Sequence, residues 1–227
     1  MGLGIMLSDT AIFSLKLSFL VAGTATFFII LVSLPVAYVL ARTRFPGKEL
    51  LDIVLTMPLV LPPTVTGYYL IVFFGKNGVI GKAIYALTGW TIMFTWYAAV
   101  LAAFVVSLPF MLKTTRSAIE SVDRNLIDAS YTLGHGEFYT AVKIVIPLSK
   151  NGIFAGIALS FTRALGEFGA TLMLAGNIPG KTETMPLAIY SSVSSGNWPE
   201  ANLMALVFVV LSAVLLFIAG KFTNKAI

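Results

Sequence analysis

The chain has 227 residues, of which 58% are hydrophobic and only 11% are charged, whereas soluble domains carry about 25% charged residues. This composition excludes an ordinary soluble domain and a disordered chain. The absence of cysteine and the single histidine leave no metal-ligand set and no nucleophile–base pair. The net charge of +5 could suggest nucleic acid, but in membrane proteins basic residues mark the cytoplasmic side, so no nucleic acid partner is expected.

Long uncharged stretches predict an all-α, multi-pass membrane protein with a single transmembrane domain over residues 1–227. A membrane-spanning helix needs about 20 mainly apolar residues, and the segments 17–41, 53–75, 83–112 and 201–220 contain no charged residue. We expect about five spans, at roughly 15–41, 51–74, 91–112, 152–174 and 202–221. The first is read as a retained span, because no basic residue precedes Lys16 as it would in a signal peptide.

Segment 80–88 is apolar but too short to cross the membrane, so it is expected to form a small interfacial helix.

The orientation of the chain in the membrane follows from the basic residues. One set of loops would carry Lys76, Lys82 and Lys181. The opposite set would carry many more: Arg42, Arg44, Lys48, Lys113, Arg116, Arg124, Lys143, Lys150, Lys221 and Lys225. The richer side should be cytoplasmic, which places the N-terminus outside and the C-terminus and the loop 113–150 in the cytoplasm of the cell.

The second expected span is rich in proline. Pro58, Pro62 and Pro63 lie near its middle, and Thr64 and Thr66 follow. Each proline removes a helical hydrogen bond, and broken backbone at membrane depth is tolerated only where it packs in protein or lines a cavity. The segment is therefore a candidate wall or gate of a pathway, with a packed kink between helices as the alternative.

The fourth expected span contains two charges. Arg163 and Glu167 are four residues apart, so on one continuous helix they would share a face and pair. A charge at the centre of a membrane is costly, so both should face the protein interior or water. They are candidate pathway or gate residues, and an ion pair that fixes helix packing is an equal alternative.

The polar stretch 113–150 predicts a short helix, a sharp turn and a second helix. Asp123 can cap the first helix and Gly134 can end it. One apolar face of the first helix would contain Leu126, Ala129, Ser130 and Leu133. The second helix, from about Glu137 to Pro147, would align Phe138, Val142 and Val145. Such a loop could lie on the lipid surface or act as a docking site for a soluble partner.

Two phosphate-binding patterns fail. Residues 176–182 contain Gly180-Lys181-Thr182, but the position of the first glycine of a P-loop is Ala175. The Gly134-His135-Gly136 sequence follows no strand and is a turn. We therefore expect no ATP-hydrolysing site, and the energy for any driven transport must come from another chain or from an ion gradient.

The loop 113–150 resembles a family. Membrane subunits of binding-protein-dependent ABC importers share a cytoplasmic pattern: Glu-Ala-Ala, three residues, Gly, nine residues, Ile, one residue and Leu-Pro. Here the matching residues are Asp128, Ala129, Ser130, Gly134, Ile144, Ile146 and Pro147. Asp, Ser and Ile replace Glu, Ala and Leu, while the spacing is unchanged. The resemblance implies that these residues belong to a coupling loop that docks on an ATP-hydrolysing subunit.

Three other segments extend the resemblance to nearly the whole chain. Segments 45–48, 58–64 and 163–180 look like those of the molybdate permeases of this family, and sulfate and tungstate permeases are similar there. This implies a cell-membrane permease with several partners. They are a second copy of the chain, a cytoplasmic ATPase dimer that binds ATP and Mg, and an extracytoplasmic oxyanion-binding protein. The chain itself would bind no cofactor. From another class, a self-contained ion-coupled transporter or channel remains the alternative.

Overall fold

The computed structural model describes residues 8–224, and this part of the chain is helical and contains no strand. The predicted all-α class is therefore confirmed. The helices of the first half are α1 (Asp9–Arg42), α2 (Lys48–Thr56), a 3₁₀ turn (Met57–Leu59), α3 (Pro63–Phe74), α4 (Gly81–Thr88) and α5 (Trp96–Glu120). The second half contains α6 (Arg124–Thr132), α7 (Glu137–Thr140), a π-helical turn (Ala141–Val145), α8 (Ile146–Leu148), α9 (Lys150–Leu165), α10 (Gly169–Ala175), α11 (Met185–Ser194) and α12 (Trp198–Asn224). Lys225 and the first seven residues lie outside the described residues.

Helices α1, α5 and α12 are each long and apolar enough to cross a membrane. Two further pairs of helices pass the same test but are bent. The pair Lys48–Leu59 and Pro63–Phe74 is bent by 117°, and the pair Glu137–Leu148 and Lys150–Leu165 by 71°. Within residues 8–224 there are therefore three such helices, or up to five if each bent pair counts as one span.

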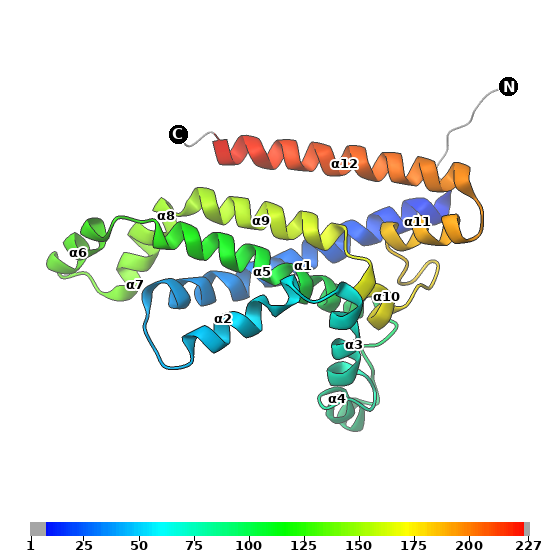
Figure 1. Cartoon of the computed structure of the whole chain (residues 1–227), viewed down its shortest axis with the longest axis horizontal. Coiled ribbons are helices and arrows are strands. Elements are labelled where there is room, and N and C mark those ends of the chain that lie inside the picture. The colour runs from blue at the N-terminus through cyan, green and yellow to red at the C-terminus, as the bar shows by residue number, and fades with distance from the viewer. Residues whose placement is uncertain (1–7, 225–227) are drawn as a thin grey trace.

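The core of the fold is a bundle in which α1, α5 and α9 lie side by side (Figure 1). Small residues on α1 and α5 are fully buried where these helices meet: Ala22, Ala25, Ala98, Ala99, Ala102 and Ala103. Small side chains let helix backbones approach closely, which is how membrane helices associate without a hydrophobic driving force. Helix α12 covers the bundle, and over residues 198–217 its side chains are mostly apolar and few are buried, as expected for a helix that faces lipid.

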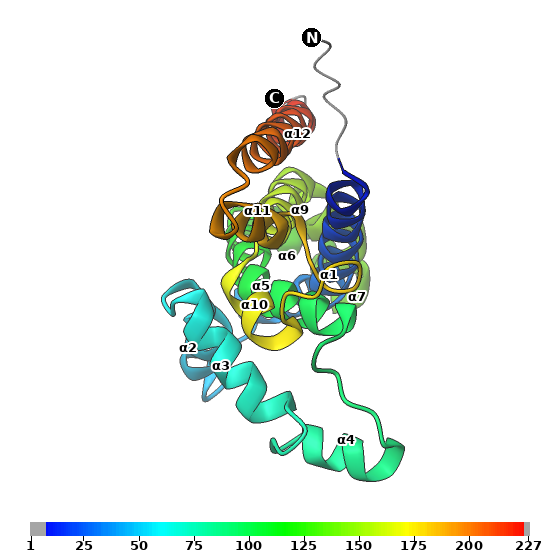
Figure 2. The same ribbon diagram turned by 90° about the vertical axis from the view of Figure 1, so that its right-hand side faces the viewer.

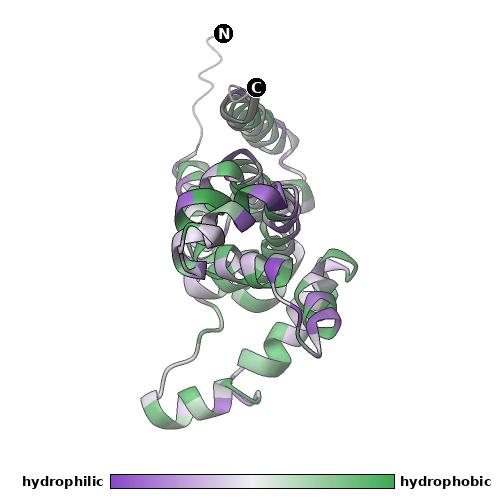
Figure 3. Ribbon diagram, turned by 90° about the vertical axis from the view of Figure 1, so that its left-hand side faces the viewer, coloured by the Kyte–Doolittle hydropathy of each residue, from purple (hydrophilic) through white to green (hydrophobic). Residues whose placement is uncertain are grey.

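The two ends of the bundle differ. The start of α1 and α11 lie at one end, whereas α6 and α7 lie at the other, toward which α12 runs (Figure 1). Helices α3 and α4 extend away from the bundle (Figure 2). When the molecule is viewed from the α6 end, this arm is mostly hydrophobic (Figure 3). The short segment expected to be interfacial is the helix α4.

Several expected spans have different bounds in the structure. The span predicted at 91–112 begins at Trp96, because Thr95 caps α5 by accepting a hydrogen bond from the backbone N–H of Ala98. It continues to Glu120, since residues 113–120 contain neither glycine nor proline, so these residues belong to α5 and not to a loop. The expected span 15–41 extends over Asp9–Arg42, and the expected span 202–221 extends over Trp198–Asn224.

The two spans predicted at 51–74 and 152–174 are not single helices. The first is divided at residues 60–62 and the second at residues 166–168. The segment after residue 175 also contains a helix that sequence analysis missed, α11, which has Pro186 in its first turn. Proline is favoured there because the N–H groups of a first turn have no partner within the helix, so proline loses no hydrogen bond. Pro186 was therefore the sequence signal for the start of this helix.

Candidate functional site

Each proline of the second expected span begins or precedes a helical turn. Pro58 lies in the 3₁₀ turn, Pro62 immediately precedes α3, and Pro63 is the first residue of α3. The fixed φ of proline suits the start of a helix, so the three residues produce a sharp change of direction and not a kink within one helix. Thr64 is exposed, whereas Thr66 is buried and its hydroxyl donates to the carbonyl of Pro62 at 3.5 Å.

The two divided helices pack on each other at their breaks, α3 against α10. A Cβ atom on Gly67 would lie 2.7 Å from the Cβ of Met173 and 2.9 Å from the Cα of Ala170. A Cβ on Gly169 would lie 3.0 Å from the Cβ of Pro63. A Cβ atom at position 67 would therefore force α3 and α10 apart, and one at position 169 would be tighter than ordinary packing. Glycine allows the close approach of these helices, whose sequences are about 100 residues apart.

We predict that Gly67→Ala separates α3 from α10 and lowers stability by about 1–3 kcal/mol, as overpacking usually does. Gly166→Ala is the matched control, because a Cβ there would meet only the carbonyl oxygen of Thr162 at 3.7 Å. The thermal midpoint of the purified protein in detergent measures the difference. Equal midpoints for the two variants would contradict the close contact.

The predicted pairing of Arg163 with Glu167 is confirmed, with 2.7 Å between Nη2 of Arg163 and Oε2 of Glu167. The expectation of one continuous helix face is wrong, because α9 ends at Leu165. Glu167 lies in the break, its side chain is 1% exposed, and its Oε1 accepts a hydrogen bond from the N–H of Ala170 at 2.8 Å. The carboxylate therefore connects the last turn of α9 to the first turn of α10.

The loop between α5 and α9 has the geometry of a helix, a turn and a second helix. The carboxylate of Asp123 accepts from the N–H of Asn125 at 2.9 Å and caps α6. Gly134 has φ +84°, a left-handed conformation that costs other residues about 1–2 kcal/mol. We name residues 123–148 the helical loop; it lies at the end of the bundle opposite to the start of α1 (Figure 1).

The predicted apolar face of α6 is wrong in part. Ser130 is buried together with Ile127, while Leu126 and Leu133 are exposed by 48% and 76%. The reason is that Ile127 packs into the bundle and Ser130 pairs with a hydroxyl, so Leu126 and Leu133 are left on the outer surface with Phe138. The other residues of the resemblance pattern differ in burial: Asp128, Ala129, Gly134 and Pro147 are exposed, and Ile144 and Ile146 are half-buried.

Polar contacts hold the helical loop together. The hydroxyls of Ser130 and Thr140 lie 2.8 Å apart and are buried. The carboxylate of Glu137 accepts hydrogen bonds from the hydroxyls of Tyr131 and of Tyr38, which is on α1. The bonds from Tyr131 and Tyr38 lower the pKa of Glu137, so this carboxylate is charged at neutral pH.

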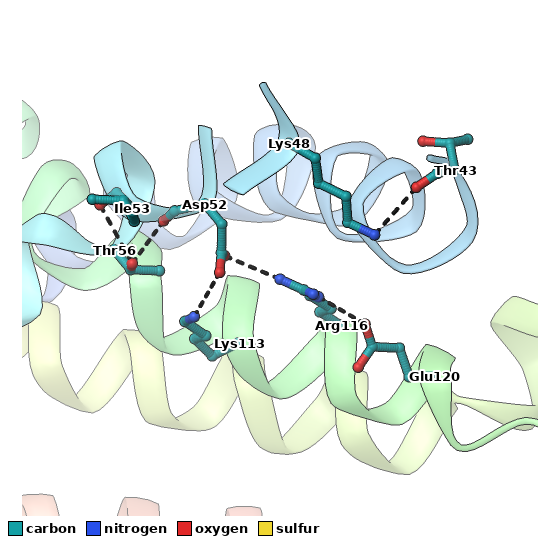
Figure 4. Close-up of polar contacts among 8 residues, drawn as sticks. All are labelled: Thr43, Lys48, Asp52, Ile53, Thr56, Lys113, Arg116 and Glu120. Atoms are coloured by element: carbon teal, nitrogen blue, oxygen red, sulfur yellow. Dashed lines mark hydrogen bonds and ion pairs between the residues drawn. The ribbon is translucent and has the colours of Figure 1, made fainter. Parts of the chain in front are cut away.

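A second group of charges links α2 to α5 (Figure 4). Asp52 on α2 pairs with Lys113 at 3.1 Å and with Arg116 at 3.2 Å on α5. Arg116 also pairs with Glu120 at 2.8 Å. Sequence analysis missed this cluster. Helical spacing would have indicated only the pair of Arg116 with Glu120, which are four residues apart on α5. The cluster holds the first half of the divided span against α5, whereas α3 is turned by 117° and packs on α10.

Comparison with known proteins identifies the family of this chain. Residues 30–226 match the family described as binding-protein-dependent transport system inner membrane component. The chain belongs to this family. It is 41% identical over 215 residues to the molybdenum transport system permease protein ModB of Escherichia coli (strain K12), and 94% of each chain is covered.

Other transport proteins are also similar to this chain. The sulfate transport system permease protein CysT of Salmonella typhimurium (strain LT2) is 36% identical over 202 residues, with 89% of this chain and 73% of that protein covered. The fold is similar to a bacterial alginate ABC transporter in complex with an alginate pentasaccharide-bound periplasmic protein. The TM-score is 0.79 at 13% identity, over 96% of this chain and 80% of that one. The chain is therefore a membrane component of a binding-protein-dependent transport system.

Proposed function

We propose that this chain is the transmembrane permease subunit of an ATP-driven importer of a tetrahedral oxyanion, and that its cargo is molybdate. The observation that carries the proposal is the 41% identity to the molybdenum permease over 94% of both chains. Sulfate is the second candidate, because the sulfate permease is 36% identical over 89% of this chain.

The proposed complex contains two copies of this chain, two cytoplasmic ATPase subunits that bind ATP and Mg, and an extracytoplasmic binding protein that delivers the anion. The exposed surface of the helical loop, with Leu126, Leu133 and Phe138, would dock on the ATPase. Asp128, Ala129, Ser130, Gly134, Ile144, Ile146 and Pro147 form this coupling element. ATP binding would move the loop, and the helices would then open the pathway alternately to each side.

The proposed pathway runs beside the two divided helices, at the breaks between α2 and α3 and between α9 and α10. Broken helices are tolerated at membrane depth where they line a cavity, and the N-terminal end of a helix carries partial positive charge that favours an anion. Pro58, Pro62, Pro63, Thr64 and Thr66 would form one wall. Arg163, whose side chain is 27% exposed, would supply positive charge beside it, held in place by Glu167.

The cargo is tested with the complete complex reconstituted in liposomes with molybdate, tungstate or sulfate on the binding protein. We expect ATP hydrolysis to be stimulated most by the molybdate-loaded protein. Greater stimulation by sulfate would favour the second candidate. Uptake by this chain without the ATPase would refute an ABC importer and favour an ion-coupled transporter.

The proposed orientation, with the start of α1 outside and the end of α12 in the cytoplasm, gives a further prediction. Single cysteines at His135 and Asn177 should react with a membrane-impermeant maleimide from opposite sides, and the absence of native cysteine makes the labelling specific. We expect only the variant at position 177 to react in intact cells. Reaction of both positions in intact cells would refute this topology.

A further inference from the structure

The carboxylate of Glu137 lies between the two halves of the helical loop and α1. It accepts a hydrogen bond from Tyr131, on α6, and another from Tyr38, on α1. Glu137 itself is the first residue of α7. One charged group thus joins three helices, and hydrogen bonds to charged groups are the strong ones.

Apolar packing joins the loop to the same part of α1. Ile127 of α6 and Val145 of the π-helical turn are completely buried, in one cluster with Ala37 and Leu40 of α1 and with two buried side chains of α5. Tyr38 packs against this cluster. The loop therefore rests on the last two turns of α1 and on α5, and the hydrogen bond from Tyr38 is the polar contact of Glu137 with α1.

Helix α1 also contacts the opposite end of the molecule. Its 34 residues span about 50 Å at 1.5 Å per residue. The hydroxyl of Ser18 accepts a hydrogen bond from the N–H of Met185, the first residue of α11, at 2.7 Å in a buried position. Ser8, which caps α1, donates to Glu200 of α12 at 2.5 Å. Among the described helices, α1 thus joins the helical loop to both α11 and α12.

We propose that Glu137 is a positioning residue that fastens the helical loop to α1, so that displacement of the loop is passed along α1 to α11 and α12 at the other end. The inference rests on the proposed function and deepens it, because it names the helix that receives the movement of the ATPase. Within the described residues no cationic side chain forms an ion pair with Glu137. Its hydrogen bonds come from the two hydroxyls, and the nearby positive charge of Arg42, the last residue of α1, also lowers the pKa of Glu137.

The test uses Tyr38→Phe, which removes the contact with α1 only, and Glu137→Gln and Glu137→Ala. Tyr139→Phe is the matched control, since its ring stacks on His135 in the same loop and none of the hydrogen bonds found in residues 8–224 uses its hydroxyl. Each variant is reconstituted with the ATPase and the molybdate-loaded binding protein. Co-purified ATPase, ATP hydrolysis and uptake per ATP are measured.

We expect Tyr38→Phe and Glu137→Ala to retain ATPase binding and hydrolysis while uptake per ATP falls about tenfold, the low end of the effect of losing a hydrogen bond to a charged group. Glu137→Gln, which keeps an acceptor oxygen, should recover part of the loss. Uptake per ATP equal to that of Tyr139→Phe would overturn the inference, and so would loss of ATPase binding, which would make Glu137 a docking residue. A wild-type complex that no oxyanion stimulates would refute the proposed function instead.

Discussion

Gly134→Asp should leave the chain in the membrane but weaken ATPase binding or uncouple ATP hydrolysis from uptake. Gly134 has φ +84°, and a residue with a Cβ atom costs about 1–2 kcal/mol in that conformation. A Cβ there would meet no atom within 4 Å, so strain would arise from the backbone alone. The new carboxylate would also lie beside the exposed Leu133, on the surface proposed to dock. Co-purification of the ATPase and substrate-stimulated hydrolysis measure the loss.

Two further variants separate strain from charge. Gly134→Ala introduces only the backbone strain and should have a smaller effect than Gly134→Asp. Gly136→Ala is the matched control, because Gly136 has φ −79° and open space around its Cβ. Normal ATPase binding and hydrolysis in Gly134→Asp would remove the coupling role from the helical loop. Altered membrane association alone would favour the alternative in which this loop lies on lipid.

Arg163→Ala should lower the stability of the protein more than the loss of an exposed surface charge. It would leave the carboxylate of Glu167, with a side chain that is 1% exposed, without its counter-charge. Removal of one partner of a buried ion pair costs about 3–5 kcal/mol, and we expect the low end, about 3 kcal/mol, because Arg163 is partly exposed. The thermal midpoint of the complex in detergent measures the effect, with Lys181→Ala, at an exposed position, as control.

The double variant tests the pairing directly. Arg163→Ala with Glu167→Gln should be more stable than Arg163→Ala alone, because no buried charge remains and the amide oxygen can still accept from the N–H of Ala170. If the stability losses of the two single variants add up to that of the double variant, the interaction between Arg163 and Glu167 does not contribute to stability. A double variant that is stable but inactive would assign Arg163 to the pathway, whereas normal uptake would leave the pair a role in packing only.

Composition and hydropathy alone determined the class of this protein. Apolar stretches of about 20 residues without a charge are long enough to cross a membrane as helices, and they predicted a helical membrane protein. The local chemistry of the helical loop was also visible, since the cap at Asp123 and the left-handed Gly134 depend on neighbouring residues only. The ion pair of Arg163 and Glu167 was predicted from the high cost of isolated charges in a membrane.

Only the tertiary structure decided how far each helix continues and which segments meet. The breaks at residues 60–62 and 166–168 pack together through Gly67 and Gly169, and no local signal reveals a contact across about 100 residues. The apolar residues Leu126 and Leu133 were expected to share a face with Ser130, but Ile127 took the buried position. Helical periodicity tells which side chains lie on one face, whereas burial depends on which neighbouring helix that face meets. For the same reason, the links from Glu137 to α1 and from Asp52 to α5 emerged only when the helices were placed side by side.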